Sequence, residues 1–424
     1  MSNSILIKSV KIIDKNSSYH EQIVDVLVEN SEIAKIQPSI DAVGLEVYNA
    51  QGQCLSLGWF DVFATCPDPG EPWKETLSSL SVAANVGGFT SVALLCGSNP
   101  LSDNASVVGQ IKNQSIGLQT NIYPLGLSSE KQEGKEMAEV FEMNQAGALA
   151  QTDGIVNSAS VSLRSKLMQY CASLKIPYLH FPFESKLVTG GSVHEGYVHV
   201  NLGLKGLPTA SETIALLADI ELAKWLNVPV RILGISSKES VEIVRNAKKS
   251  GMDIKVAVPI MNLAYDESAI GEFDENFKVL PPLRTEEDRT ALVAAVLDGT
   301  IDAIFSNHQP SDIESKNVEF DHAHFGTATL PAFFSMLLSA FGEKNLPHAI
   351  EVLTVGSAAF YGIEVPKFAE GQKANLTIFN PNQTFTLNSH NKGSLAYNVI
   401  GMNQPTQGRI LATVCNGILT VNTD

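Results

Sequence analysis

Short apolar segments alternate with helix-like segments through the middle of the chain, and this alternation restricts the fold more than any other feature. The expected strands are 55–63, one near 119–125, FTSVALLC (89–96), GALAQTD (147–153), PYLHF (177–181), VPVRILGIS (228–236), IKVAVPI (254–260) and GTIDAIFSNH (299–308). Residues 209–227 and 237–251 have helical character, and the second segment begins with a Ser cap and ends with lysines and Gly251. About eight strand–helix units predict a (β/α)8 TIM-type barrel. A doubly wound sheet is the alternative, but no Gly-x-Gly-x-x-Gly or Walker-type loop supports it.

Both ends of the chain have the two-residue alternation of β-strands. ILIKSVKII and IVDVLVENSEIAKI at the start contain a turn at Glu29-Asn30-Ser31, and RILATVCNGILTV near the end contains a turn at Asn416-Gly417. We therefore expect a small composite β domain from residues 1–54 and 369–424, and a barrel from residues 55–368.

The composition narrows the possible partners and compartment. Hydrophobic residues make up 44% of the chain and charged residues 17%, which is typical of a globular protein with a large core. The net charge of −16 argues against nucleic acid or an anionic membrane as the main partner. No apolar run is long enough for a membrane span, no signal peptide is visible, and the five scattered cysteines lack a C-x-x-C pair. These features predict a cytoplasmic protein with reduced thiols.

The end of the first barrel strand reads DVFATCPDPG (61–70), where an apolar run meets a polar loop. Active sites of such barrels lie at the C-terminal ends of the strands, yet Phe63, Ala64 and Thr65 offer no metal ligand or proton carrier. The surrounding sequence, LGWFDVFATCPDPGEPWKETLSSLSVAANVGGFTSVALLCGSNP, resembles the start of a dihydroorotase of the amidohydrolase superfamily. GKEMAEVFEMNQAGALAQTDG, GSVHEG, LPPLRTEEDR, DGTIDAIFSNHQPSDIESK and FAEGQKANLTIFNP extend the resemblance collinearly over nearly the whole chain.

The resemblance implies a (β/α)8 barrel and a zinc-assisted opening or closure of a cyclic amide, in which the metal lowers the pKa of a bound water. Family members have histidine ligands where this chain has Phe63, Thr65 and Gly234. His180 lies at a retained histidine position, and Asp153 is the candidate for the bridging carboxylate. Most of the implied metal ligands are therefore replaced.

The positions implied for proton transfer and substrate binding are also changed. Asn307 replaces the catalytic aspartate, and an amide cannot take the proton. Pro67 replaces an arginine that binds the substrate carboxylate, while Gly97, Leu280 and Ser311 replace two asparagines and a histidine. The resemblance thus indicates a catalytically degenerate dihydroorotase, which we expect to have no catalytic residues and no cofactor.

Three functions remain open from the sequence. The first is a non-catalytic scaffold or regulatory partner of aspartate carbamoyltransferase, with the homodimer that the family implies. The second is a cyclic amide hydrolase with a reworked zinc site, drawing on His180, Asp153, Cys66 and Cys96. The third is a binding module for a pyrimidine-like ligand.

Several residues also have plain structural interpretations. We interpret His180 as a hydrogen-bonded interior histidine, Asp153 as a possible cap of the following turn at Gly154, and the two cysteines as buried hydrophobes. His308, His322 and His324 are interpreted as parts of the barrel end and a solvated loop. Lys74, Glu75 and Glu212 are expected to be helix-face or capping charges, and Gly70, Gly87 and Gly88 to allow close backbone approach.

Overall fold

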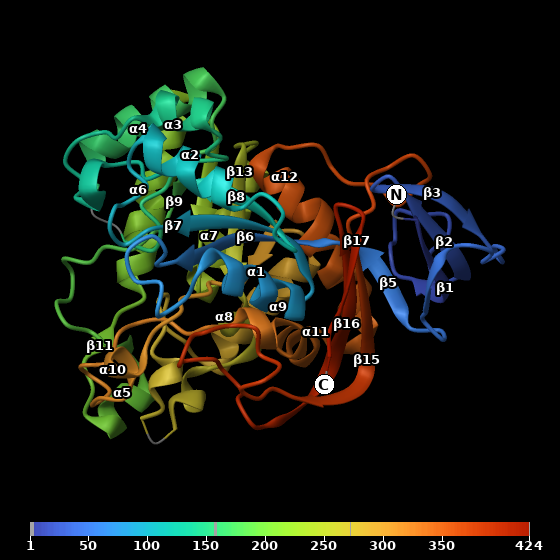
Figure 1. Ribbon diagram of the computed structural model, residues 1–424. Helices are drawn as coiled ribbons and strands as arrows, with labels where there is room; N and C mark the ends of the chain where they lie inside the picture. Colours follow the sequence, from blue (N-terminus) through green and yellow to red (C-terminus); the bar gives the residue numbers. More distant parts are fainter. Residues whose placement is uncertain (1–3, 157–158, 272, 424) are drawn as a thin grey trace.

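The computed structural model describes residues 4–156, 159–271 and 273–423. The parallel strands of the barrel form two sheets, and Figure 1 shows them inside a layer of helices. One sheet contains β6 (Trp59–Cys66), β7 (Phe89–Cys96) and β8 (Asn121–Leu125); the other contains β9 (Leu179–His180), β12 (Val230–Leu233), β13 (Ile254–Pro259) and β14 (Ala303–Phe305). A separate parallel pair consists of β10 (Val193–His194) and β11 (Gly206–Leu207).

Isolated parallel bridges join the two sheets into a closed ring. Ala64 pairs with His308 on one side, and Gln151 pairs with both Gly126 and Tyr178 on the other. Gln151 lies in the expected strand 147–153, so this segment takes the fourth strand position through a single pairing residue. Counted this way, the ring contains eight strand positions, and the predicted (β/α)8 architecture is confirmed.

Helices cover the outside of the ring because their apolar faces pack on the strands. The α-helices of the described ranges, of which α5 packs in a separate cluster and not on the ring, are α1 (Leu77–Val86), α2 (Ala105–Gln114), α3 (Val140–Ala146), α4 (Val161–Leu174), α5 (Tyr197–Leu202), α6 (Ala210–Leu226), α7 (Lys238–Lys249), α8 (Ile260–Ala264), α9 (Glu286–Leu297), α10 (Ile313–Lys316), α11 (Phe333–Glu351) and α12 (Ser357–Tyr361). The helices expected at 209–227 and 237–251 are α6 and α7. The predicted Ser237 cap accepts a hydrogen bond from the N–H of Ser240, at 3.2 Å.

Both ends of the chain build one further sheet, with strand order β17-β16-β15-β5-β1-β2-β3 and β4 paired to β1 (Figure 1, blue and red). Its strands are β1 (Ser4–Ile12), β2 (Ile23–Glu29), β3 (Glu32–Gln37), β4 (Glu46–Asn49), β5 (Cys54–Leu57), β15 (Leu376–Thr386), β16 (Pro405–Cys415) and β17 (Ile418–Val421). Both predicted hairpin turns are present. Asn30, Ser31, Asn416 and Gly417 all have positive φ, as a two-residue hairpin loop of this kind requires.

The expected single strand at 55–63 is wrong. Leu55 to Leu57 belong to β5 and pair with β1 and β15, whereas β6 of the barrel starts at Trp59. Gly58 separates the two strands, and a β-carbon there would lie 2.1 Å from the Thr90 hydroxyl. A continuous apolar run does not reveal that its two halves enter different sheets. The exact domain boundaries stay a prediction.

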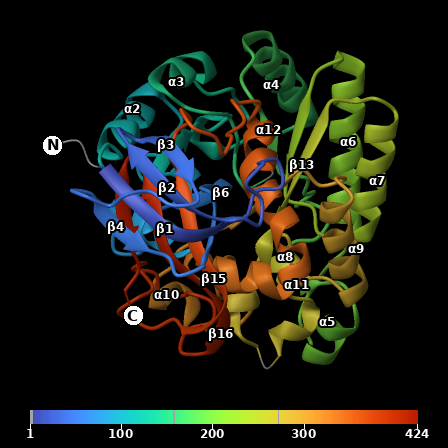
Figure 2. The same ribbon diagram turned by 90° about the vertical axis from the view of Figure 1, so that its right-hand side faces the viewer.

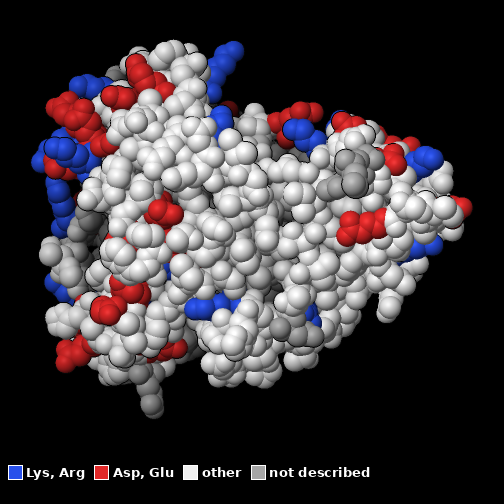
Figure 3. Space-filling model, viewed as in Figure 1, with Lys and Arg blue, Asp and Glu red and all other residues white. Residues whose placement is uncertain are grey.

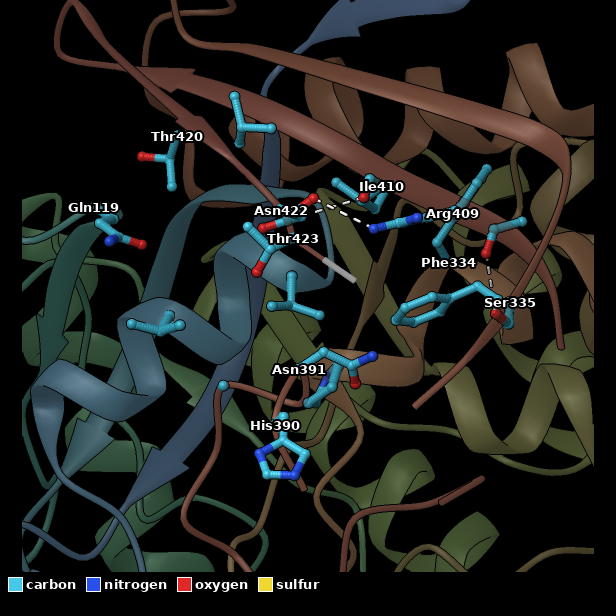
Figure 4. Close-up of a pocket in the computed structure, with 17 residues that line it drawn as sticks. Gln119, Phe334, Ser335, His390, Asn391, Arg409, Ile410, Thr420, Asn422 and Thr423 are labelled. Atoms are coloured by element: carbon cyan, nitrogen blue, oxygen red, sulfur yellow. Dashed lines mark hydrogen bonds between the residues drawn. The ribbon is translucent and has the colours of Figure 1, made fainter. Parts of the chain in front are cut away.

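The seam between the terminal sheet and the barrel contains a pocket of about 200 Å³ (Figure 4). There Arg409 donates to the carbonyl oxygen of Asn422 at 3.3 Å and lies 5.3 Å from the ring centre of Phe385. These contacts tie β15, β16 and the residue after β17 together, so the pocket belongs to the packing of the terminal sheet.

The distribution of charge on the surface can be compared with the partners that the sequence excluded. On the face seen in Figure 3, basic side chains occur in small groups interspersed with acidic ones. Within the described ranges, no helix combines the length and apolarity that crossing a membrane would need.

Candidate functional site

Asp61 connects the first and last strands at the barrel mouth. Its carboxylate accepts hydrogen bonds from the N–H of Ser306 at 2.9 Å and of Phe63 at 3.3 Å, and from the Ser306 hydroxyl. Because the side chain is fully buried, desolvation raises the pKa of Asp61 to about 7, against the lowering effect of these hydrogen bonds. Asp61 therefore helps to hold the ring closed.

Aromatic rings fill the barrel interior where the resemblance implied histidine ligands. Phe63 is fully buried and meets Phe305 edge-to-face, with ring centres 6.1 Å apart. Gly234 has a φ of +88°, and a β-carbon there would touch the rings of Phe181 and Phe305 at 3.4–3.5 Å. The space beyond Gly234 is thus taken by these two rings.

Asp153 caps the turn after β8. Its Oδ1 accepts from the N–H groups of Ser128 and Ser129 at 3.1 and 2.9 Å, and its Oδ2 accepts from the Ser129 hydroxyl at 2.8 Å. The expected cap on the following turn is wrong, because the N–H of Gly154 bonds to the Thr152 hydroxyl instead. Both carboxylate oxygens of Asp153 are engaged by the β8 loop.

His180 is a hydrogen-bonded interior histidine, as expected. Its Nδ1 bonds to Asp219 of α6, and the other oxygen of Asp219 bonds to Arg164 of α4. All three side chains are buried. The arrangement ties strand β9 to the helices behind it and fixes the imidazole ring.

Asn307 lies at the end of β14 with a φ of +52°, a conformation that asparagine tolerates better than most residues. Its amide donates to the carbonyl of Leu280 at 3.0 Å and accepts from Gln309 at 3.0 Å. The hydroxyl of Thr65 donates to the carbonyl of His308, also at 3.0 Å. Thr65 and Asn307 therefore join neighbouring segments at the barrel mouth by hydrogen bonds to backbone carbonyls.

Glu75 is an interior carboxylate that sequence reasoning placed wrongly on a helix face. It is fully buried and accepts from the hydroxyl of Ser394 and, at 3.1 Å, from the N–H of Leu395. His308 accepts two backbone N–H bonds at Nδ1, which leaves Nε2 as the donor nitrogen, and Nε2 lies 3.7 Å from Glu75. Burial pushes the pKa of Glu75 upward, but His308 and the nearby hydroxyls outweigh it and lower the pKa. No sequence pattern pairs Glu75 with these distant residues.

Glu212 lies in the first turn of α6 but is buried, and it bonds to the segment before α7, whose N-cap is Ser237. It accepts from the N–H groups of Ser236 and Ser237 at 3.0 and 3.1 Å, just before α7, and pairs with Arg284 at 3.3 Å. Burial raises the pKa of Glu212, but the charge of Arg284 and the serine hydrogen bonds bring it below its ordinary value. Arg284 also donates to Nδ1 of His194, at 3.0 Å.

The expectations for the loop histidines and for Gly70 are met, whereas Lys74 lies in a turn before α1 and not on a helix face. His322 and His324 are exposed, as the solvated-loop interpretation requires. Gly70 has a φ of +128°, and a β-carbon there would lie 2.5 Å from the backbone nitrogen of Asn99. It therefore allows the close backbone approach that we expected.

The residues at the mouth do not fit a catalytic zinc ion. Such an ion needs about three protein ligands, and within the described ranges no three His, Cys, Asp or Glu side chains come together in a way that could hold a metal. Cys66 and Cys96 pair across β6 and β7, and burial raises the pKa of both thiols far above the usual value. The reworked centre of Cys66, Cys96 and His180 is therefore not assembled.

A pocket of about 270 Å³ lies beside β6 and β7 at the mouth. It is lined by four of the predicted altered positions: Thr65, Pro67, Gly97 and Ser311. The structure thus places these four residues around one pocket, whereas Phe63 lies in the barrel core.

Ser102 also lines this pocket, and its fully buried hydroxyl finds no hydrogen-bond partner in the part of the chain that the structure describes. Lys74 is paired with Glu71 at 2.6 Å within the pocket wall. The lining therefore contains both polar and apolar side chains, and the positive charge of Lys74 is locally neutralised.

The fold is shared with solved hydantoinases. An L-hydantoinase (dihydropyrimidinase) from Arthrobacter aurescens superposes with a TM-score of 0.85 at 19% identity, covering 100% of this chain and 96% of that one. A D-hydantoinase (dihydropyrimidinase) from Thermus sp. gives a TM-score of 0.81 at 18% identity, with coverages of 99% and 95%. At this identity the likeness shows the fold alone.

Sequence relatives give the family. A family model described as dihydro-orotase-like matches residues 55–240. A protein named dihydroorotase from Geobacter metallireducens is 30% identical over 419 residues, covering 98% of each chain. Another of the same name from Carboxydothermus hydrogenoformans is 33% identical over 402 residues, covering 93% of each. The chain therefore belongs to the dihydroorotase family.

Proposed function

We propose that this chain is a dihydroorotase-like protein of pyrimidine biosynthesis that does not open or close the dihydroorotate ring, and that it serves as a scaffold or regulatory partner of aspartate carbamoyltransferase. The observation that carries the first half is the aromatic filling of the barrel mouth. The rings of Phe63, Phe181 and Phe305 occupy the space around two positions where family members have histidine ligands.

The replaced residues include more than the metal ligands. The hydrolytic step needs a group that takes and returns a proton, and Asn307 is an amide bonded to Leu280 and Gln309. Asp153 could not approach an ion without giving up its bonds to the β8 loop. Metal binding, proton transfer and substrate binding are changed at separate residues, so no single reversion would restore the reaction.

The first part of the proposal, the absence of dihydroorotase activity, is tested on a single protein preparation purified without chelators. We expect zinc content near zero and no hydrolysis of dihydroorotate above background. Stoichiometric zinc together with hydrolysis would overturn the proposal in favour of a cyclic amide hydrolase with a reworked metal site. A variant carrying Phe63→His, Thr65→His, Gly234→His and Asn307→Asp shows whether the barrel can accept the implied ligands, with folding checked by circular dichroism.

The scaffold half rests on the retained architecture and on the family relationship. We expect the chain to co-purify with aspartate carbamoyltransferase from the same cell, and mixing the two to raise the activity or stability of the transferase. Absence of association at every ratio and salt concentration would refute it.

The pocket beside β6 and β7 supports a second candidate, a binding module for a small pyrimidine-like ligand. Ser102 offers a buried hydroxyl that has no hydrogen-bond partner among the described residues, and the lining also contains the amides of Gln132 and Gln309. Because Pro67 replaces an arginine and Lys74 is already paired with Glu71, neutral cyclic amides should bind better than carboxylates. Calorimetry with dihydrouracil, dihydroorotate, orotate and carbamoyl aspartate tests this; no heat from any of them excludes the candidate.

A further inference from the structure

A pocket of about 510 Å³ lies at the end of the barrel opposite the mouth, where the barrel meets the terminal sheet, and we call it the bottom pocket. Phe60 and Thr90, near the N-terminal ends of β6 and β7, line its barrel side. Glu32 of β3 and Lys373 line the side of the terminal sheet. Figure 2 looks onto the terminal sheet, with α12 beside it, and the segment 363–367 after α12 completes the wall. The bottom pocket is therefore formed by the barrel and the terminal sheet together.

The inner wall of the bottom pocket is aromatic and apolar. The ring centres of Phe60 and Tyr123 lie 5.4 Å apart with an interplanar angle of 45°, and Phe60 also stacks on Tyr361 at 5.7 Å. Leu57 and Ile363 extend the apolar part of the wall. Small-molecule sites in proteins commonly enclose about 300–1,000 Å³ within such walls and contain a few well-placed polar groups. The volume and the lining of the bottom pocket thus match a site for a ring compound.

Thr90 supplies a polar group to this wall. The residue is 1% exposed, and its hydroxyl has no hydrogen-bond partner within the described ranges. Gly58 lies against it in the same wall, where a β-carbon would come within 2.1 Å of the hydroxyl oxygen, and it has no side chain that could bond to Thr90. Because an unpaired buried hydroxyl is unfavourable, a bound molecule that pairs with Thr90 gains affinity from this contact.

The charged side chains that line the bottom pocket cancel one another. They are two acids and two bases: Glu32, Glu364, Lys367 and Lys373. The lining therefore favours neither an anion nor a cation. The amides of Gln372 and Asn375, which offer both donors and acceptors, also line the pocket. A neutral molecule with polar substituents fits this lining.

We propose that the bottom pocket binds a neutral heteroaromatic molecule of nucleoside size, with its ring against Phe60 and Tyr123 and one of its polar groups hydrogen-bonded to the Thr90 hydroxyl. A purely apolar ligand would leave that hydroxyl unpaired, and a charged ligand would meet charges of both signs. Because the barrel and the terminal sheet form the pocket together, the ligand binds only the folded chain and should stabilise it. The site is separate from the pocket of Thr65 and Ser102 at the barrel mouth.

Calorimetry of the full chain with uridine and adenosine as probes tests the proposal. We expect at least one of them to bind the wild type, and Thr90→Val to weaken that binding roughly 3–10-fold through the loss of one hydrogen bond. Thr90→Val keeps the shape of the side chain, so the ligand-free variant should melt no lower than the wild type. Ser102→Ala is the matched control, because it removes a buried hydroxyl of the mouth pocket and should leave the affinity for the nucleoside unchanged.

A second pair of variants tests the aromatic contact. Tyr123→Leu should weaken nucleoside binding roughly 5-fold or more, whereas Tyr123→Phe keeps the ring and should bind nearly as the wild type does. Circular dichroism checks that all variants are folded. A saturating nucleoside should raise the melting temperature of the wild type, and uridine monophosphate should bind no more tightly than uridine.

Three outcomes overturn the proposal. The first is the absence of heat from both nucleosides. The second is an affinity that survives both Thr90→Val and Tyr123→Leu, or that Ser102→Ala abolishes, since the probe would then bind elsewhere. The third is tighter binding of uridine monophosphate than of uridine, which would assign the pocket to anions. The proposal does not depend on the absence of dihydroorotase activity, so hydrolysis by the wild type would leave it standing.

Discussion

Replacement of Asp61 by asparagine should change how stability depends on pH. The pKa of Asp61 is about 7 in the folded protein, whereas an unperturbed aspartate, as in the unfolded chain, has a pKa of 3.8. The folded state therefore binds this proton more tightly, and the stability that Asp61 contributes is full below about pH 4 and is lost as the pH rises through 7. At 1.36 kcal/mol per pKa unit, the free energy of unfolding falls by about 4 kcal/mol in total because of Asp61.

Asp61→Asn keeps the shape of the side chain and removes the titration. Its amide oxygen can accept from the N–H of Ser306, and its NH2 group can donate to the Ser306 hydroxyl. Urea unfolding of both proteins from pH 4.5 to 8 measures the difference in the free energy of unfolding, in which groups common to both cancel. We expect the wild type to lose about 3 kcal/mol relative to the variant over this range. Parallel curves would show that the hydrogen bonds to Asp61 outweigh its burial and that it is ionised throughout.

Three further predictions concern the barrel end and the loop beside it. Gly234→Ala should lower the free energy of unfolding by about 1–2 kcal/mol, because the residue at this position has a positive φ. Gly234→His should lower it by a further 1–3 kcal/mol or so, because the imidazole ring must displace the neighbouring aromatic rings. Equal stability of the two variants in urea unfolding would show that the space beside Gly234 is open. Glu212→Gln should lower the free energy of unfolding by about 3–5 kcal/mol, because Arg284 is left charged and buried without its partner. Glu287→Gln, which breaks an exposed ion pair, should change the free energy of unfolding little. Similar urea midpoints for the two variants would contradict the burial argument. The pKa of His194 is lowered to about 4 by burial and by the charge of Arg284. The stability that neutral His194 contributes to the folded state is therefore present above pH 6.5 and is lost as the pH falls through 4. The melting temperature of the wild type should fall more steeply over this pH range than that of His194→Asn.

The sequence predicted those parts of the fold that depend on local pattern. Strand β7 and helices α6 and α7 follow from apolar periodicity and capping residues, and the positive-φ hairpins follow from Asn416-Gly417 and its counterpart. The division of the apolar run at Gly58 could not be predicted, because β5 and β6 differ only in their partners. Pairing with distant strands has no signature in a short segment.

The candidate site was predictable to a similar degree. The resemblance identified the altered positions, and the apolar ring of Phe63 excludes that side chain as a metal ligand. The contacts of Asp153 could not be predicted, since its partners Ser128 and Ser129 lie about 25 residues away on another loop. Glu75 was misplaced because its neighbour Lys74 is partly accessible, whereas Glu75 faces His308 and Ser394, far along the chain.

The composite sheet has a consequence for synthesis on the ribosome. Strand β5 lies between β1 and β15 in the sheet, but β15 is made about 320 residues after β5. At roughly 5–20 residues per second, the β15 side of β5 stays unpaired for about 16–64 s. A free apolar edge is a template for pairing with other chains. The N-terminal strands of this protein should therefore be a binding site for chaperones during translation, until the last fifty residues close the sheet.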